Sequence, residues 1–122
     1  MILGIGTDII EIERVRRAVA SEHFRKKVFT ANEQNYCESR GAQSAASYAA
    51  RFAAKEAFFK ALGTGIFTSL TEVETLNDAA GKPEIFLYGK AKTFAGNLGV
   101  EKIFVSLSHC QNYATAFVTL TN

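Results

Sequence analysis

The sequence predicts a single α+β domain in which one long helix packs against antiparallel strands. The long helix is expected at residues 44–62, an alanine-rich segment without proline or glycine. Two pairs of short apolar segments predict hairpins: residues 70–76 with 84–88, and residues 102–108 with 113–121. Helices that precede hairpins along the chain favour an α+β fold built around an antiparallel sheet. The expected order of elements is β-α-α-α-β-β-α-β-β.

Length and composition restrict the class of protein. A chain of 122 residues is one domain, residues 1–122, and 48% hydrophobic residues suffice for a small core. The net charge of +2 is too small to indicate a nucleic-acid partner. Neither a signal peptide nor a membrane span is expected, because no apolar run has the required length or flanks. Cys37 and Cys110 lack metal-ligand spacing and are expected to be free thiols, which favours the cytoplasm.

The first strand is expected over residues 2–10. Its alternation places Gly4, Gly6 and Asp8 on one face. Two glycines on one face leave room for a close neighbour or a ligand, and Asp8 follows them. A local interpretation of Asp8 competes with this one, because Asp8 and Glu11 also fit a capping box that opens the next helix.

Three helices are expected before the first hairpin and one after it. The first covers residues 10–19, where apolar residues recur at helical spacing. The second begins at a capping box formed by Thr30 and Glu33. The third is the long helix, and residues 89–98 predict a short helix between the two hairpins.

The long helix begins at Ser44 or Ser47 and carries an acid and a base one turn apart, Glu56 and Lys60. A carboxylate on a poorly solvated face is costly unless a cation meets it. The local interpretation is an ion pair between Glu56 and Lys60 at i and i+4. Both faces are largely apolar: one carries Ala54, Ala57, Phe58 and Ala61, and the other carries Phe52 and Phe59 around Glu56 and Lys60.

The candidate chemistry rests on two isolated carboxylates, Asp8 and Glu56, because the chain lacks a nucleophile elbow, CxxC, HExxH or Walker motif. Few hard oxygen ligands suit Mg²⁺, which keeps waters and takes the rest of its shell from substrate phosphates. Lys60 and the backbone amides of the glycine loop at residues 63–65 would hold those phosphates. His109 ends a predicted strand, where a histidine is a candidate ligand contact but more often a surface residue. Together these residues outline a site for phosphoryl transfer.

Basic residues cluster near the N-terminus. Between Arg14 and Lys27 the chain has six Arg or Lys residues and one acid, Glu22, so this window is +5 and the remainder is −3. Such a patch attracts an acidic partner or phosphates, and its alternative interpretation is a solvated helix face.

Four segments carry a resemblance to a known family. They are GIGTDIIEIERV at residues 4–15, RFAAKEAFFKALGTGI at 51–66, GKP at 81–83 and VSLSH at 105–109. In this order and spacing they resemble the holo-acyl-carrier-protein synthases, the small single-domain group of 4′-phosphopantetheinyl transferases. The likeness covers essentially the whole chain, so the expected fold is that of this family.

The resemblance implies transfer of 4′-phosphopantetheine from coenzyme A to a serine of apo-acyl carrier protein, in support of fatty acid biosynthesis, with release of adenosine 3′,5′-bisphosphate. It implies that Asp8 and Glu56 bind Mg²⁺ and that Lys60 contacts the pyrophosphate, these three forming the catalytic group. It also implies a homotrimer with active sites between neighbouring subunits. The other implied residues are a coenzyme A pocket of Lys60, Gly63, Thr64, Gly65, Arg51, Pro83 and His109, and a carrier-docking surface of Arg14, Arg17 and Arg25.

Some alternatives stay open at this point. The base that deprotonates the serine is Glu56, Asp8 or a metal-bound water, and the water is favoured because the carboxylates are occupied. A Mg²⁺-dependent nucleoside-diphosphate hydrolase would use the same carboxylates without a basic docking face. A non-catalytic module would bind an acidic helix through Arg14 and Arg17, leaving Glu56 and Lys60 as a simple ion pair.

Overall fold

A computed structural model describes all residues, 1–122, and confirms the α+β class. None of its helices is long and apolar enough to cross a membrane. The elements follow one another as β1 (Ile2–Glu11), α1 (Ile12–Ala18), α2 (Glu22–Val28), α3 (Ala31–Glu38), α4 (Ser44–Leu62), β2 (Val73–Asn77), β3 (Pro83–Leu87), α5 (Gly89–Asn97), β4 (Lys102–His109) and β5 (Tyr113–Thr121).

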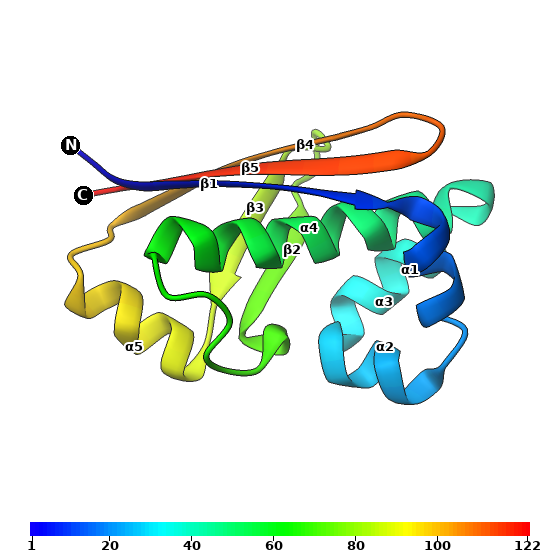
Figure 1. Cartoon of the computed structure of the whole chain (residues 1–122), viewed down its shortest axis with the longest axis horizontal. Coiled ribbons are helices and arrows are strands. Elements are labelled where there is room, and N and C mark those ends of the chain that lie inside the picture. The colour runs from blue at the N-terminus through cyan, green and yellow to red at the C-terminus, as the bar shows by residue number, and fades with distance from the viewer.

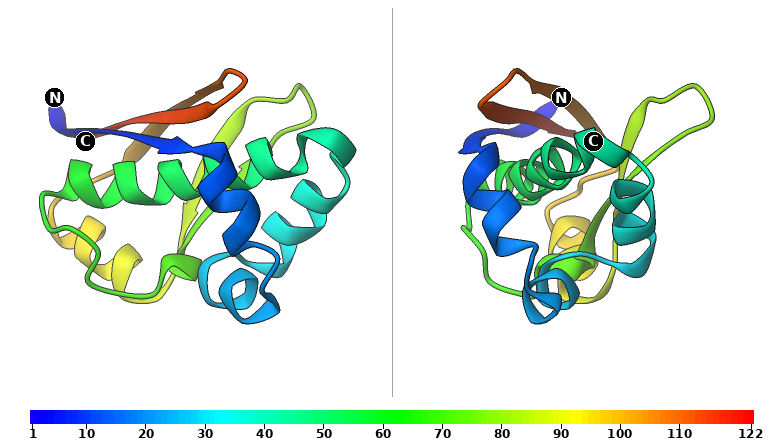
Figure 2. Two further views of the ribbon diagram at one scale, coloured as in Figure 1. Left: turned by 45° about the vertical axis from the view of Figure 1, so that its right-hand side comes forward. Right: turned by 90° about the vertical axis from the view of Figure 1, so that its right-hand side faces the viewer.

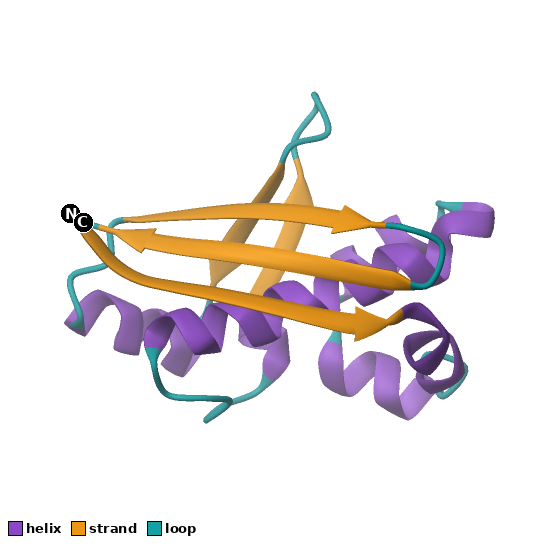
Figure 3. Ribbon diagram, turned by 45° about the horizontal axis from the view of Figure 1, so that its top comes forward, coloured by secondary structure: helices purple, strands orange, loops and turns teal.

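The long helix α4 is the centre of the molecule, and a three-stranded antiparallel sheet covers one side of it (Figure 1). The strand order is β1-β5-β4, so the last strand of the chain lies between the first strand and β4 (Figure 3). Asp8 of β1 lies opposite Ala116 of β5. The chain termini meet at one end of the sheet, where the Met1 amino group donates to Asn122 Oδ1 at 2.9 Å.

The predicted hairpins are both present, but they do not join into one sheet. β2 and β3 form a separate two-stranded sheet whose turn projects beside the rest of the molecule (Figure 2). Helices α1, α2 and α3 gather at one end of α4, and α5 lies at the other end (Figure 1). The expectation of a single sheet around α4 is therefore corrected to two sheets.

The glycines of β1 serve a close contact with α4. A Cβ at Gly4 would overlap the carbonyl oxygen of Ala61, and one at Gly6 would overlap that of Ala57 and lie 2.7 Å from the amide nitrogen of Ala61. The neighbour that requires glycine here is thus the helix backbone and not a ligand. This contact holds β1 against one flank of α4 and determines where Asp8 lies.

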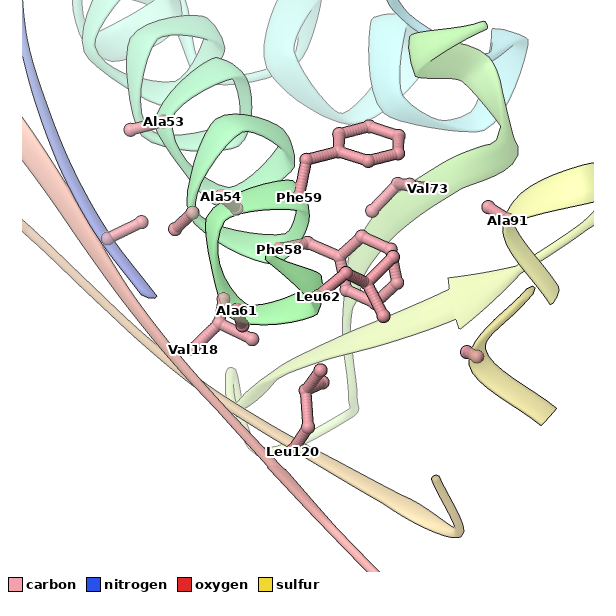
Figure 4. Close-up of a cluster of buried hydrophobic side chains, with 13 residues drawn as sticks. Ala53, Ala54, Phe58, Phe59, Ala61, Leu62, Val73, Ala91, Val118 and Leu120 are labelled. Atoms are coloured by element: carbon pink, nitrogen blue, oxygen red, sulfur yellow. The ribbon is translucent and has the colours of Figure 1, made fainter. Parts of the chain in front are cut away.

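The predicted apolar stripe of α4 is buried, as expected. Its members Ala54, Ala57, Phe58 and Ala61 are at most 7% exposed. Phe59, from the other face, and Leu62 are buried as well, and with Phe58 they pack toward Val73 of β2 (Figure 4). The alanines of the same helix let β5 approach, and Val118 of that strand joins the cluster. Removal of this apolar area from water is the main term that stabilises the fold.

A buried ion pair that was not expected from the sequence links the helical end to the β2–β3 sheet. Lys55 Nζ donates to Glu33 Oε1 at 2.8 Å, and both side chains are inaccessible to solvent. Lys55 also donates to the carbonyls of Leu70 and Val73, and Glu33 Oε2 accepts from the Thr75 amide. Such a pair is stable only because nearly every donor and acceptor has a partner.

Two details of the helical segment differ from expectation. The capping box of Thr30 and Glu33 is confirmed, but an additional helix, α2, precedes it, capped by the Ser21 side chain, which accepts from the Phe24 amide. The capping role of Asp8 is wrong, because β1 continues to Glu11 and α1 has no side-chain cap. The order of elements is therefore β-α-α-α-α-β-β-α-β-β.

Candidate active site

Asp8 reaches the flank of α4 because β1 runs past the helix with Gly4, Gly6 and Asp8 on one face. The two glycines lie directly over the helix backbone, and Asp8 is the first residue on that face with a functional side chain. Its side chain is 15% exposed, so the carboxylate is largely shielded yet open at one edge.

Lys60 of α4 bridges to this strand. Its Nζ lies 3.1 Å from Asp8 Oδ1 and 3.0 Å from the carbonyl oxygen of Thr7. The expected i, i+4 ion pair between Glu56 and Lys60 is not among the ion pairs of the structure, and the partner of Lys60 is Asp8 instead. The contact across elements replaces the local one because Asp8 already has its position fixed by the strand.

Glu56 lies one turn before Lys60 and is half-buried. Burial raises the pKa of Glu56 above its usual 4.5, and the negative charge of Asp8 raises it further, while Lys60 opposes the shift. The two carboxylates therefore interact electrostatically, as required of groups that would share one ion. An acidic pair that is costly to ionise is stabilised by any cation that binds between its members.

The donor set fits Mg²⁺ better than a transition metal. The pair consists of two carboxylates, and no cluster of three or more His, Cys, Asp or Glu side chains is available to hold a metal. Magnesium accepts one or two carboxylates and completes its octahedral shell with waters and phosphate oxygens. Asp8 and Glu56 are thus the residues of this chain that would hold the ion.

The glycine loop after α4 differs from the phosphate cradle expected of it. Gly63 adopts a left-handed φ of +81°, and its amide donates to the carbonyls of Phe59 and Lys60. The Thr64 amide donates to Phe59 as well, so both amides complete the helix C-terminus. The amide of Gly65 has no partner within the chain and is the donor of this loop that stays available to a ligand.

Arg51 and Pro83, two other predicted coenzyme A residues, lie away from the acidic pair. Arg51 is buried, donates to Ser47 Oγ and Asn77 Oδ1, and stacks on the Tyr36 ring with 4.2 Å between its guanidinium carbon and the ring centroid. Its Nε has no hydrogen-bond partner. Pro83 pairs with Asn77 across the β2–β3 hairpin, at the base of its projecting turn. Because Arg51 donates to the side chain of Asn77, Arg51 and Pro83 both lie near this base.

His109 lies in a third place, at the end of β4. It lines a pocket of about 370 Å³ together with Arg16 of α1 and Gln43, which precedes α4. Strand β5 separates β4 from β1, so His109 and Asp8 belong to opposite edge strands of the sheet. A single chain therefore brings together Asp8, Glu56 and Lys60, and holds the other three residues apart from them.

The basic residues are unequal in their availability. Arg14 and Arg17 are exposed on α1, whereas Arg25 is half-buried and donates to the Val19 carbonyl, which fixes the turn between α1 and α2. Arg14 also lines an apolar pocket of about 130 Å³. The sequence did not suggest this pocket, whose other lining residues are Ile10, Val15, Ala18, Phe24 and Phe52.

The pocket adjoins the acidic pair along two of the elements that line it, β1 and α4. Ile10 is the next residue after Asp8 on the inward face of β1, and Phe52 lies one helical turn before Glu56 on α4. An apolar side chain seated in the pocket would therefore lie beside the two carboxylates.

Comparison with known proteins gives the family of the chain. Residues 4–118 match the model of the 4′-phosphopantetheinyl transferase superfamily. The holo-[acyl-carrier-protein] synthase of Ruminiclostridium cellulolyticum is 53% identical over 121 residues, which cover 96% of this chain and 90% of the relative. The chain belongs to the holo-acyl-carrier-protein synthase family of 4′-phosphopantetheinyl transferases.

Solved structures of the family share the fold. The crystal structure of the Neisseria meningitidis holo-[acyl-carrier-protein] synthase superposes with a TM-score of 0.89 at 36% identity, covering 100% of both chains. That of a Bacillus anthracis synthase in complex with CoA (3′,5′-ADP) gives a TM-score of 0.82 at 36% identity, covering 98% of this chain and 96% of the other. The family match includes the acidic pair, the glycine loop and His109.

Proposed function

We propose that the chain transfers 4′-phosphopantetheine from coenzyme A to a serine hydroxyl of apo-acyl carrier protein in a Mg²⁺-dependent reaction that releases adenosine 3′,5′-bisphosphate. The observation that carries the proposal is the cluster of Asp8, Glu56 and Lys60 in a chain of this family. The reaction would serve fatty acid biosynthesis, whose carrier proteins need the pantetheine arm.

Each member of the cluster has a task in this proposal. Asp8 and Glu56 hold the ion, which when bound neutralises charge that develops on the leaving bisphosphate. Lys60 holds a phosphate oxygen through its ammonium group, and the free amide of Gly65 is a second donor at the same end of α4. Asp8 is largely shielded and Glu56 is half-buried, and this partial burial strengthens these interactions.

Carrier docking is assigned to the pocket beside the acidic pair. Its apolar lining accommodates an aliphatic side chain, and Arg14 at its edge attracts a carboxylate next to that side chain. Arg17 extends the positive surface. Arg25 acts mainly by fixing the turn between α1 and α2, which presents this surface. An acidic helix with one apolar residue fits this arrangement and would present its serine toward Asp8 and Glu56.

Assembly into a homotrimer belongs to the same proposal, and two observations support self-association. Arg51, Pro83 and His109 lie apart from the acidic pair within one chain, so a complete coenzyme A pocket needs a second copy. The outer face of the three-stranded sheet is also strongly apolar, which is unusual for a solvated surface. Its exposed large apolar residues are Leu3, Ile5, Ile9, Phe104, Tyr113 and Phe117. The proposal includes a cytoplasmic location, which two free thiols support.

Mass spectrometry of the carrier tests the proposal. The chain is incubated with Mg²⁺, coenzyme A and an apo-acyl carrier protein, and the carrier is weighed. A gain of one phosphopantetheine is expected with wild-type carrier and no gain with a carrier whose acceptor serine is alanine. An unchanged carrier together with release of free phosphopantetheine would instead identify a hydrolase.

A further inference from the structure

We propose that Lys60 is an internal counter-cation of the acidic pair and that it couples metal binding to diphosphate binding. In the metal-free protein its ammonium group neutralises Asp8, and a divalent ion has to displace it there. The displaced ammonium then favours an anionic ligand at the same place. The inference rests on the proposed metal site at Asp8 and Glu56.

The first observation that supports a counter-cation role is the position of Lys60. Its Nζ has two acceptors on β1, Asp8 Oδ1 at 3.1 Å and the Thr7 carbonyl oxygen at 3.0 Å. Asp8 is 15% exposed and Lys60 is 54% exposed, so the ammonium approaches the carboxylate from the open side of the site. A ligand that enters the site meets this ammonium before it meets Asp8.

The second observation, which supports the coupling, is the net charge of the site. Two carboxylates and one ammonium have a net charge of −1, and a divalent ion changes it to +1. The acidic pair therefore accepts the ion, and the loaded site then favours an anion. Without Lys60 the charge would change from −2 to 0, so the ion would bind more tightly and the anion less tightly.

The bond to Thr7 explains why Lys60 remains useful after it releases Asp8. The Thr7 carbonyl does not belong to the acidic pair, so the ammonium can keep this acceptor while a metal takes the Asp8 oxygens. Held in this way, Lys60 stays beside the site with donors free for a diphosphate oxygen. Metal and diphosphate thus strengthen each other's binding, and the coupling is reciprocal by thermodynamic necessity.

Calorimetry on the full chain tests this coupling with Mg²⁺ alone and with Mg²⁺ plus adenosine 5′-diphosphate, using free-metal concentrations corrected for the metal–nucleotide complex. Lys60→Met is expected to bind Mg²⁺ about 5-fold more tightly than wild type when no nucleotide is present, because a partly exposed charge has a modest effect. The nucleotide should tighten Mg²⁺ binding about 10-fold in wild type and clearly less in Lys60→Met, where only the direct attraction between metal and diphosphate remains. Lys60→Arg should restore the coupling, since it keeps the charge.

Matched variants separate the possible failures. Lys26→Met is the control, because Lys26 also forms an ion pair, with Glu22 at 2.8 Å, but on the exposed surface of α2. Its Mg²⁺ affinity should equal that of wild type. Equal Mg²⁺ affinities in wild type and Lys60→Met without nucleotide, or a nucleotide effect as large in Lys60→Met as in wild type, would overturn the coupling. If Asp8→Asn bound Mg²⁺ as tightly as wild type, the metal site itself would fall, and the coupling with it.

Discussion

Glu56 is a carboxylate whose ionisation is unfavourable at its position in the fold. The side chain is half-buried next to Asp8, and both circumstances raise its pKa. Its ionised form is therefore less favourable in the folded protein than in the unfolded chain. Residues with this property are typical of functional sites, because an ideal structural position would not combine burial with a second negative charge.

A pH series with Glu56→Gln tests this directly. Because the folded pKa of Glu56 lies above its unfolded value of about 4.5, the folded protein binds more protons in that interval and loses stability as the pH rises through it. In the absence of divalent ions, the variant and wild type should melt alike near pH 4. At pH 7 the variant should melt about 2 °C higher. A wild type that melts higher than Glu56→Gln at pH 7 would show that Glu56 is stabilised there, contrary to its environment.

Asp8→Asn should remove turnover without unfolding the protein. The side chain of Asp8 has one hydrogen-bond partner, Lys60, which retains the Thr7 carbonyl, so the fold has little to lose. Loss of a charged ligand at the reacting phosphate should lower kcat by more than ~100-fold. The control is Glu11→Gln, a carboxylate of the same strand on its exposed side. Near-normal turnover of Asp8→Asn at saturating Mg²⁺ would refute the assignment.

At this scale the residue types were predictable from the sequence and their partners were not. Isolated carboxylates followed by a lysine and a glycine loop identified Asp8, Glu56 and Lys60. Spacing along a helix also favoured a pair between Glu56 and Lys60, because local rules consider only neighbours on the same element. The actual partner of Lys60 lies 52 residues away in sequence, and only the packing of β1 on α4 brings it near.

The contact between β1 and α4 is the element-scale feature on which the site depends. Gly6 permits an approach that no side chain allows, and Asp8 is two residues further along the same face. A lengthening of this distance would move Asp8 away from Glu56. The glycines therefore determine where Asp8 lies, through their contact with the helix backbone.

Gly6→Ala should destabilise the protein by about 3 kcal/mol, the upper range for overpacking, because the added methyl group meets backbone atoms that cannot move aside. Denaturant unfolding measures the change. Gly96→Ala is the matched control: this glycine lies within α5 with open space around it, and the substitution should stabilise by about 0.5–1 kcal/mol. Unfolding midpoints that move equally for both variants would contradict the close contact.

The elements themselves were largely predictable where periodicity is strong. The alternation at residues 113–121 matched β5 residue for residue, and the alanine-rich segment matched α4. Helix α2 was missed because it has seven residues, and the cap at Ser21 is followed at the third helical position by Phe24 rather than an acid. The pairing of β1 with β5 was beyond prediction, since strand partners far apart in sequence leave no local pattern.

At the scale of the whole molecule, two exposed surfaces differ in character. The sheet shields one side of α4 but leaves its own outer face apolar, and the acidic pair opens beside a basic, apolar pocket. The first surface suits another copy of the chain, and the second suits an acidic partner. The role of each surface can be tested by a substitution of its own.

Phe117→Lys should dissociate the proposed trimer and abolish activity with it. Phe117 is 47% exposed at the centre of the sheet's outer face, where a lysine would be buried on assembly. Light scattering after gel filtration measures the mass. Leu98→Lys, at a residue that is also 47% exposed but follows α5, should leave the mass unchanged. A wild-type chain that is monomeric and fully active would exclude the assembly.

Arg14→Glu should raise the KM for carrier protein about 10-fold or more and leave the KM for coenzyme A nearly unchanged, because a reversed charge at the docking pocket repels an acidic helix. Steady-state kinetics at two salt concentrations measures both. The wild-type KM for carrier should rise with salt, whereas that of the variant should respond less. Lys90→Glu on exposed α5 is the charge-matched control. Equal effects on both substrates would count against a docking role for Arg14.

The position of β5 has a consequence for folding during synthesis. This strand is synthesised after all the other elements described here, yet it separates β1 from β4 and covers α4. A nascent chain that stops before residue 113 contains every other element but lacks the strand that joins β1 to β4. We expect the enzyme to acquire its tertiary structure only once residues 113–121 have been synthesised, and a chain truncated before them to be an early substrate for chaperones and proteases.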